Sequence, residues 1–166
     1  TPSSSSAASD VYKRQIFTQM KEDVSKTKMA VSLMLTLPRI PQILYGTEIL
    51  MEDSAKPGDH GLIRTDFPGG WKNDKSNAFK GYNLENSQLE MQNYLKTLLN
   101  FRKNSKAIHE GETLHYAPKD GIYLLSRKHE DEIVIYIVNK NDKSVKLDTD
   151  RFIEIDANGK VFTDIH

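Results

Sequence analysis

The chain has 166 residues, enough for one ordinary domain or parts of two, and it has no Cys, which excludes disulfide bonds and thiolate metal sites. Its 23 Lys and Arg residues balance 23 Asp and Glu residues, so a nucleic-acid or anionic-membrane partner is disfavoured and a neutral ligand such as a sugar fits. No apolar run approaches the roughly 20 residues that a membrane-spanning helix needs.

Residues 1–15 form a leader rich in Ser and Ala that we predict to be disordered. The leader lacks the basic segment followed by an apolar segment that marks a signal peptide. Its sequence resembles translated library or adaptor sequence found at the ends of unrelated reading frames, and a natural flexible linker is the alternative. Fold prediction therefore begins at Ile16.

A helix followed directly by a short buried strand is predicted for the next segment. Residues 16–37 carry apolar side chains at helical spacing, and Pro38 ends the helix. Gln42–Tyr45 is short, apolar and bounded by Pro41 and Gly46, which is typical of a strand buried on both faces. This order is the half-unit of an α/β barrel, in which sites lie beyond the carboxyl ends of the strands.

Residues 49–86 read as a long irregular loop, because they are rich in Gly, Pro, Asn and Asp. The loop also contains several aromatic residues, so a functional loop is favoured over a disordered linker. The pattern from Ser87 to Glu90 predicts a capping box, and apolar residues at helical spacing predict a helix to about Lys106.

The last part of the chain changes to the period of β-strands. Residues 121–125 and 132–138 are predicted strands joined by a charged turn. Asn158 and Gly159 predict a hairpin turn between strands at residues 153–155 and 160–162. The switch near Gly111 predicts a domain boundary, with residues 16–110 before it and a small all-β domain of residues 111–166 after it.

Several motifs together resemble a known family. These are the stretch from Arg39 through Ile-Pro-Gln-Ile-Leu-Tyr-Gly-Thr to Glu48, the stretch from Arg64 to Trp71, the pair Phe101 and Arg102, and the exit from Ala107 to Gly111. They resemble α-amylase-type glycoside hydrolases of the neopullulanase or cyclomaltodextrinase kind. The resemblance implies a fold in which residues 16–110 are the C-terminal end of an eight-fold β/α TIM barrel, as helix, strand, loop and helix. It also implies that residues 111–166 are an incomplete antiparallel β-sandwich.

The resemblance implies a reaction, but it identifies no catalytic residue in this chain. The family cleaves α-1,4-glucosidic bonds of maltodextrin, cyclodextrin or pullulan by a retaining mechanism, which needs two carboxyl groups about 5–5.5 Å apart. The three catalytic carboxylates of the family lie on earlier strands, and the segment from Asp10 to Arg14 stands where an Asn-His-Asp motif is expected. We therefore assign no catalytic residue and expect this chain alone to be inactive, while the parent protein is a hydrolase. A non-catalytic carbohydrate-binding or structural module is the alternative.

Six residues are candidates for substrate binding by resemblance, and each has a structural alternative. Tyr45 either lines the sugar site or is a core aromatic residue, and Glu48 either meets substrate or anchors the loop. Asp59 and Arg64 either grip glucose hydroxyl groups or form an ion pair that orders the loop, and Asp66 shares that role. Trp71 either stacks on a pyranose ring or belongs to a small core within the loop.

No metal or cofactor site is predicted. The five His residues lack ligand spacing, and Asp53 with Asp59 is too little for calcium, which is compatible with the parent enzyme but has no ligand set here. The expected partner is an α-glucan oligosaccharide. The compartment, bacterial periplasm or cytoplasm by resemblance, and the oligomeric state are left open.

Overall fold

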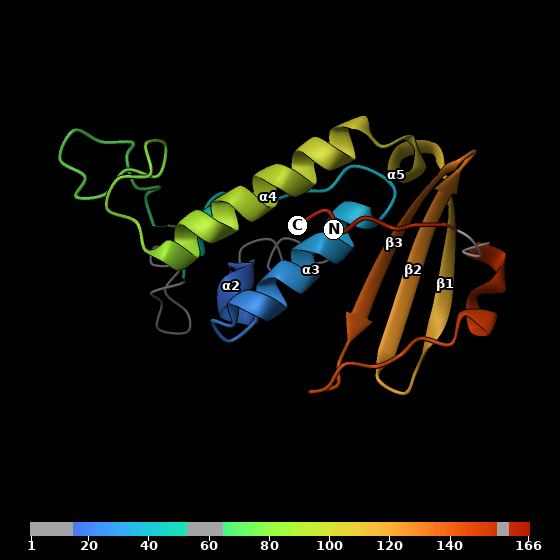
Figure 1. Cartoon of the computed structure of the whole chain (residues 1–166). Coiled ribbons are helices and arrows are strands. Elements are labelled where there is room, and N and C mark those ends of the chain that lie inside the picture. Colours follow the sequence, from blue (N-terminus) through green and yellow to red (C-terminus); the bar gives the residue numbers. More distant parts are fainter. Residues whose placement is uncertain (1–14, 53–64, 156–159) are drawn as a thin grey trace, which may run out of the picture. The chain divides into compact units, whose positions relative to one another are not determined.

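A computed structural model describes residues 15–52, 65–155 and 160–166 of the chain. These residues divide into two compact units: unit 1 holds residues 15–28 with Gln42–Leu95, and unit 2 holds Met29–Pro41 with Lys96–His166. Two helices, α3 (Val24–Thr36) and α4 (Asn86–Asn104), contribute residues to both units (Figure 1). Within the described ranges, no helix is both long and apolar enough to span a membrane.

The predicted continuous helix over residues 16–37 is wrong, because the structure has two helices there. Helix α2 (Ile16–Gln19) ends in a turn at Lys21 and Glu22, whose φ angles are +57° and +59°, and α3 follows. Asp23 precedes α3 and accepts the Lys26 N–H at 3.0 Å, as a capping carboxylate does. Hydrogen bonds from Lys26 hold the pKa of Asp23 below its ordinary value. The apolar spacing predicted helical structure correctly, but it did not predict the break before Asp23, where the second helix begins.

The predicted strand over Gln42–Tyr45 is also wrong. Residues 42–44 have no regular structure, Tyr45 begins a turn, and a short 3₁₀ helix, η1 (Thr47–Ile49), follows. A strand needs neighbours that accept and donate its backbone hydrogen bonds, and the strands that the structure describes pair with one another instead. The barrel assignment of residues 16–110 stays a prediction.

Gly46 permits a sharp turn of the backbone after Tyr45. Its φ is +86°, and the Met51 N–H donates to its carbonyl oxygen at 2.9 Å. A Cβ atom at this position would overlap the side chain of Met51, so another residue would be both strained and crowded. Gly46 therefore allows the backbone to turn after the Pro-rich segment, residues 38–41.

Helix α4 begins close to its predicted start, but with a different cap. The Glu85 N–H donates to Gln88 Oε1 at 3.0 Å, which is the reach-back half of a capping box. The box predicted between Ser87 and Glu90 is therefore wrong, because the helix starts at Asn86 and places Gln88 in the third position. Ser105 then caps a second short helix, α5 (Lys106–Glu110), by accepting the Ile108 N–H at 3.2 Å.

Arg102 joins α4 to the end of α3 within unit 2. The residue is 6% exposed, and its guanidinium donates to the carbonyl oxygens of Leu35, Leu37 (3.0 Å) and Arg39. The last carbonyl groups of a helix have no partner within the helix, so an arginine from a neighbouring helix satisfies them. Burial lowers the pKa of Arg102.

Unit 2 contains an antiparallel sheet in the order β1–β2–β3, with β1 (Glu112–Lys119), β2 (Ile122–His129) and β3 (Glu132–Asn139) (Figure 1). Helix α5 ends at Glu110, so the change from helix to strand falls at Gly111. The antiparallel sheet is confirmed. The second sheet of a sandwich is absent from the described residues and stays a prediction.

The central strand β2 is longer than predicted because a buried arginine occupies its second half. Arg127 is 2% exposed and donates to Thr113 Oγ1 and, at 2.8 Å, to the Ile108 carbonyl oxygen. From the sequence, the charge of Arg127 indicated that it lies in the turn after the strand. In the folded chain its guanidinium finds hydrogen-bond acceptors inside the structure. Strand β1 was not predicted; its pairing with β2 is irregular between Tyr116 and Lys119, around Pro118, which has no N–H to donate.

The C-terminal segment packs on the sheet as a 3₁₀ helix, η2 (Thr149–Ile155), rather than as the strand predicted at residues 153–155. Phe152 and Ile155 form a buried cluster with Leu124, and the Tyr116 ring meets Phe152 edge-on at 4.9 Å. Burial and the Glu154 carboxylate raise the pKa of Tyr116 to about 12. Residues 160–162 form no strand, and the predicted Asn158–Gly159 turn lies outside the described residues.

Glu132 fastens the start of α5 to the start of β3. Its Oε1 accepts the Ser105 hydroxyl at 2.6 Å and its Oε2 accepts the Ala107 N–H at 3.0 Å. Burial alone would raise the pKa of Glu132, but these hydrogen bonds and one from the Lys106 N–H hold it below its ordinary value. The bonds therefore favour the ionised form in the folded chain.

Replacing Arg102 by Met is expected to lower the free energy of unfolding by roughly 3 kcal/mol, since three carbonyl groups lose charged donors while the aliphatic stem remains. Urea unfolding followed by circular dichroism measures the change. Lys103→Met, at an exposed position of the same helix, is the matched control. Equal stability of the two variants would contradict the role of Arg102.

Replacing Glu132 by Gln is expected to destabilise the chain by about 1.5 kcal/mol near pH 7, because the Gln amide cannot accept both bonds. The folded pKa of Glu132 is lowered, so its contribution is present above the ordinary value of 4.5 and is lost as the pH falls through the folded pKa. The difference from the wild type should narrow between roughly pH 5 and pH 3. Glu130→Gln, in the exposed turn, should show a small difference at every pH.

Candidate functional site

Tyr45 stands at the entry to the long loop, as the sequence predicted, but it is not a core residue. Its side chain is 43% exposed, and its hydroxyl donates to the Thr65 carbonyl oxygen at 3.0 Å. Its own carbonyl oxygen accepts Gln15 Nε2 at 2.9 Å. Gln15, which was assigned to the leader, is 2% exposed, so the packed structure already includes it. Tyr45 thus ties the segment before the loop to Thr65 within the loop.

Of the other residues predicted to bind substrate before Trp71, the structure describes only Glu48 and Asp66. Asp59 and Arg64 lie outside the described residues. Glu48 is half-buried in η1, and its carboxylate makes no hydrogen bond with a described residue, so neither predicted role is seen there. Asp66 is exposed and follows the Thr65 carbonyl that Tyr45 binds. The structure therefore brings Tyr45 and Asp66 into one neighbourhood.

Asp74 fixes the backbone around Trp71, and sequence reasoning missed it. Its Oδ2 accepts the Gly69 N–H at 2.7 Å and the Trp71 N–H at 3.0 Å. Gly69 has a φ of +103°, a conformation that side-chain-bearing residues rarely adopt. An Asp shortly after two Gly residues is a turn signal, which could have indicated this role.

Asn77 closes the second half of the loop, and sequence reasoning missed it as well. Its backbone exchanges two hydrogen bonds of 2.9 Å with Tyr82, and its Oδ1 accepts the Lys80 N–H at 3.0 Å. The loop is also tied to α4, because Gln92 Nε2 donates to the Ala78 carbonyl oxygen at 3.0 Å. The loop backbone is held by its own hydrogen bonds.

Three aromatic rings stand exposed on this ordered loop: Trp71 is 68%, Phe79 75% and Tyr82 67% exposed. The alternative in which Trp71 belongs to a small core within the loop is therefore wrong. Phe67 and Phe79 do contact each other, with ring centroids 5.2 Å apart. Exposed aromatic surface on a fixed backbone is typical of a binding surface rather than of folding.

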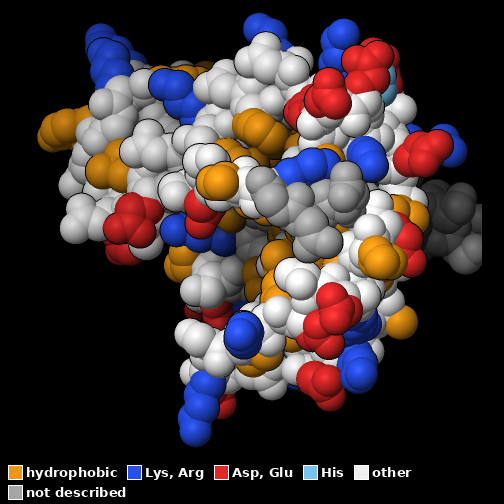
Figure 2. Space-filling model, turned by 45° about the vertical axis from the view of Figure 1, so that its right-hand side comes forward, with side chains coloured by type: hydrophobic (Ala, Val, Ile, Leu, Met, Phe, Trp, Pro, Cys, Tyr) orange, Lys and Arg blue, Asp and Glu red, His pale blue; other side chains and the backbone are white. Residues whose placement is uncertain are grey.

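The balanced charge of the chain favours a neutral ligand. Figure 2 shows Lys and Arg side chains interspersed with Asp and Glu over the visible face, without a large patch of one sign. Among the described residues, no group of three or more His, Asp or Glu side chains could hold a metal ion. The arrangement offers aromatic rings, a tyrosine hydroxyl and single carboxylates, which suit hydrogen bonds to hydroxyl groups and contacts with an apolar ring face.

Comparison with known families gives one match, over the sheet and the C-terminal segment after it. Residues 113–166 match the family described as cyclo-malto-dextrinase C-terminal domain. The matched segment begins within β1 and includes β2, β3 and η2.

Two curated relatives extend the similarity toward the N-terminus. A maltogenic α-amylase of Bacillus acidopullulyticus is 27% identical over 136 residues, which are 80% of this chain and 20% of the relative. α-Amylase 3 of Dictyoglomus thermophilum is 30% identical over 135 residues, which are 71% of this chain and 26% of the relative. The chain thus spans between a fifth and about a quarter of the length of these relatives.

A solved structure shares the fold. The crystal structure of AmyP in complex with maltose superposes with a TM-score of 0.59 at 18% identity, over 77% of this chain and 27% of that chain. At this identity the likeness concerns the fold alone, and the maltose belongs to AmyP.

Replacing Asp74 by Ala is expected to speed hydrogen exchange at the Gly69 and Trp71 amides by roughly tenfold, because both lose their acceptor. Asp74→Asn, which keeps one acceptor oxygen, should have a smaller effect. Lys72→Ala, at an exposed position of the same loop, is the control. Exchange is measured by NMR. If the exchange rates of these two amides were the same in Asp74→Ala as in the wild type, Asp74 would not fix the loop.

Proposed function

We propose that the chain serves an α-glucan hydrolase, because residues 113–166 match the family described as cyclo-malto-dextrinase C-terminal domain and the chain is similar to a maltogenic α-amylase and to an α-amylase. The enzyme would cleave α-1,4-glucosidic bonds of maltodextrin, cyclodextrin or pullulan with retention. In this proposal the chain supplies the C-terminal portion of that enzyme: a sheet domain and a loop that contacts the glucan.

Residues 16–110 would be the last helix, strand, loop and helix of the enzyme's TIM barrel. Three features support this: the order of α3, the Pro-rich segment, the loop and α4; the relatives' alignment beyond the sheet; and the exposure of apolar side chains in that segment. Ile40 is 96% and Leu44 40% exposed, although both belong to a run that a barrel would bury. Neighbouring strands of a complete barrel would cover them and supply the hydrogen bonds that Gln42–Tyr45 lacks.

The observation that carries the glucan contact is the exposed Trp71 ring on a backbone fixed by Asp74. A pyranose ring has an apolar face that stacks on an aromatic ring, and a loop ordered in advance loses less entropy on binding. Tyr45, which binds the Thr65 carbonyl oxygen, and Asp66 offer hydrogen bonds to hydroxyl groups. Glu48, Asp59 and Arg64 are assigned to the same site by resemblance.

The chain would not supply the catalysts. A retaining glycosidase needs a general acid whose pKa is raised, together with a nearby second carboxylate. Among the described carboxyl groups, Asp23 and Glu132 have displaced pKa values, and both are displaced downward by hydrogen bonds that favour the ionised form. Neither is suited to donate a proton, which supports the proposal that the chain does not supply the general acid.

Trp71 is the single Trp of the chain, so its fluorescence reports on the proposed contact directly. Titration of the whole chain with maltotriose or β-cyclodextrin is expected to change the fluorescence saturably, whereas cellotriose, with β-linkages, should not. In calorimetry, Trp71→Ala should weaken maltotriose binding at the loop about tenfold, the loss expected for one aromatic contact. Phe162→Ala, which removes a partly exposed ring in unit 2, is the matched control.

Two outcomes would contradict the proposal. Trp71 would be excluded from the site if maltotriose left the Trp fluorescence of the unmodified chain unchanged, or if calorimetry gave equal binding of maltotriose by Trp71→Ala and Phe162→Ala. Turnover of maltooligosaccharide by the purified chain would show that it does contain catalytic groups.

A further inference from the structure

Strand β3 lies at one edge of the sheet in unit 2 and, among the described residues, pairs only with β2 (Figure 1). The Lys140 N–H donates to the Gly121 carbonyl oxygen at 2.8 Å, in the register that sets Asn139 opposite Ile122. The backbone groups of successive residues in an antiparallel strand point alternately to one side and the other. The N–H and C=O groups that point away from β2 are therefore those of the odd-numbered residues, Ile133, Ile135, Ile137 and Asn139.

The outward backbone groups of Ile133, Ile135 and Ile137 form no hydrogen bond with a described residue. The three side chains share one face of the sheet, since side chains alternate along a strand. On that face Ile133 and Ile135 pack against the cluster that contains Leu124, and Ile137 stands opposite Leu124 and is 45% exposed. The edge thus combines unpaired backbone with a stripe of isoleucine.

The other edge of the sheet is protected against pairing, whereas β3 is not. Natural sheets discourage a further strand at an edge with charged residues, Pro or an irregular register. Strand β1 has Pro118 with an irregular register around it, and Glu112 and Lys119 at its ends. Residues 133–138 of β3, Ile-Val-Ile-Tyr-Ile-Val, contain neither a charge nor Pro nor Gly. A segment of this composition pairs readily with another strand.

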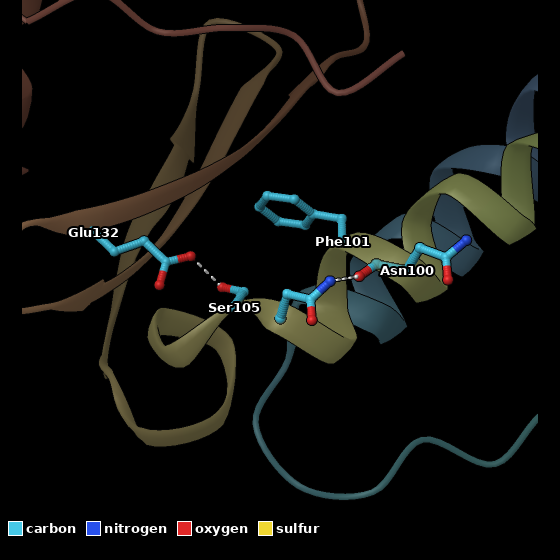
Figure 3. A pocket seen from close by; sticks show the side chains of 5 residues that line it. Asn100, Phe101, Ser105 and Glu132 are labelled. Atoms are coloured by element: carbon cyan, nitrogen blue, oxygen red, sulfur yellow. Dashed lines mark hydrogen bonds between the residues drawn. The ribbon is translucent and has the colours of Figure 1, made fainter.

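The strand is also held in place by its own side chains. Figure 3 shows Glu132, the only carboxylate of β3, turned toward Ser105, whose hydroxyl it accepts at 2.6 Å. The Tyr136 hydroxyl donates to the Met29 carbonyl oxygen at 2.8 Å. An edge that is fixed in advance loses little conformational entropy when it pairs.

A second copy of the chain fits this edge by symmetry. In an antiparallel pair about a two-fold axis, every contact occurs twice and opposite residues share a face. An axis at Ile135 sets Ile135 opposite its own copy and Ile133 opposite Ile137, so the outward backbone groups meet their complements. An axis at Tyr136 would set Ile133 opposite Asn139, which replaces an apolar pair by a mixed one. The axis at Ile135 is therefore favoured.

The charges at the two ends of β3 suit the same arrangement. Asp131 precedes the strand and Lys140 follows it, and both are exposed. Antiparallel pairing brings the start of one strand beside the end of the other, so Asp131 of each copy comes near Lys140 of the other. Parallel pairing would instead set like charges side by side.

We propose that the edge of β3 is an interface for a second copy of this chain, paired antiparallel through residues 131–139 about a two-fold axis at Ile135. The pairing joins two three-stranded sheets into one continuous sheet. It uses none of the residues assigned to the glucan contact, so either proposal can fail without the other. A single pair of strands is a small interface beside the roughly 1,000 Å² of stable complexes, so the dimer is reversible.

The first test is sedimentation equilibrium of the whole chain at about 5 to 500 µM, the range of a weak complex. The wild type is expected to pass from monomer to dimer. Ile137→Lys should raise the dissociation constant about tenfold or more, because the two-fold axis buries the new charge at two places. Leu114→Lys, on the same face of the other edge strand and 37% exposed, is the matched control and should dimerise as the wild type does. Circular dichroism checks that both variants are folded.

The second test fixes the direction and register of the strands. The chain has no Cys, so Ile135→Cys and Asn139→Cys each introduce a single thiol. In the proposed dimer the two Cβ atoms at position 135 lie about 5 Å apart, whereas the two copies of position 139 lie eight residues, about 26 Å, apart along the strands. A short bismaleimide is expected to crosslink Ile135→Cys and to leave Asn139→Cys monomeric.

Three results would overturn the proposal. The first is a monomer at every concentration, which would leave the edge to a strand from elsewhere. The second is equal weakening of the dimer by Ile137→Lys and Leu114→Lys. The third is equal crosslinking of Ile135→Cys and Asn139→Cys, which would indicate parallel stacking of the strands.

Discussion

The guanidinium of Arg102 is the group on which the helical part of unit 2 depends. It donates to the carbonyl oxygens of Leu35, Leu37 and Arg39, so α4 provides the donors that the end of α3 lacks. Arg39 has a φ of +82°, which costs conformational energy and is tolerated where such a contact holds it. One buried cation thus satisfies carbonyl groups at the end of α3 and in the segment that follows it.

In each unit, one carboxylate accepts two hydrogen bonds that fix a turn of the chain. Asp74 fixes the loop around Trp71 by accepting two backbone N–H groups, and Glu132 fixes the start of α5 by accepting one N–H and one hydroxyl. Beside Asp74, the fixed backbone leaves the Trp71 ring exposed. Fixed backbone beside such a ring suits weak, selective contact with a neutral sugar.

Local patterns predicted some elements well and others badly, for identifiable reasons. The helix α4, the strands β2 and β3 and the turn at Gly46 follow from spacing, β-propensity and backbone freedom, which neighbouring residues decide. The strand expected at Gln42–Tyr45 failed because strand pairing needs partners from elsewhere in a fold. Strand β1 was missed because its Pro118 and polar residues suit an edge strand, whose pairing with β2 compensates for a weak pattern.

The sequence by itself indicated a resemblance to α-amylase-type glycoside hydrolases, through motifs around Tyr45 and Trp71, and its balanced charge favours a neutral ligand over an anion. The placement of Tyr45 and of Asp66 near one another, the exposure of Trp71, and the hydrogen bond between Ser105 and Glu132 were decided only by tertiary structure. The physical reason is distance along the chain. Propensity and charge act between near neighbours, whereas a hydrogen bond between residues 27 positions apart, as from Ser105 to Glu132, exists only once the chain has folded.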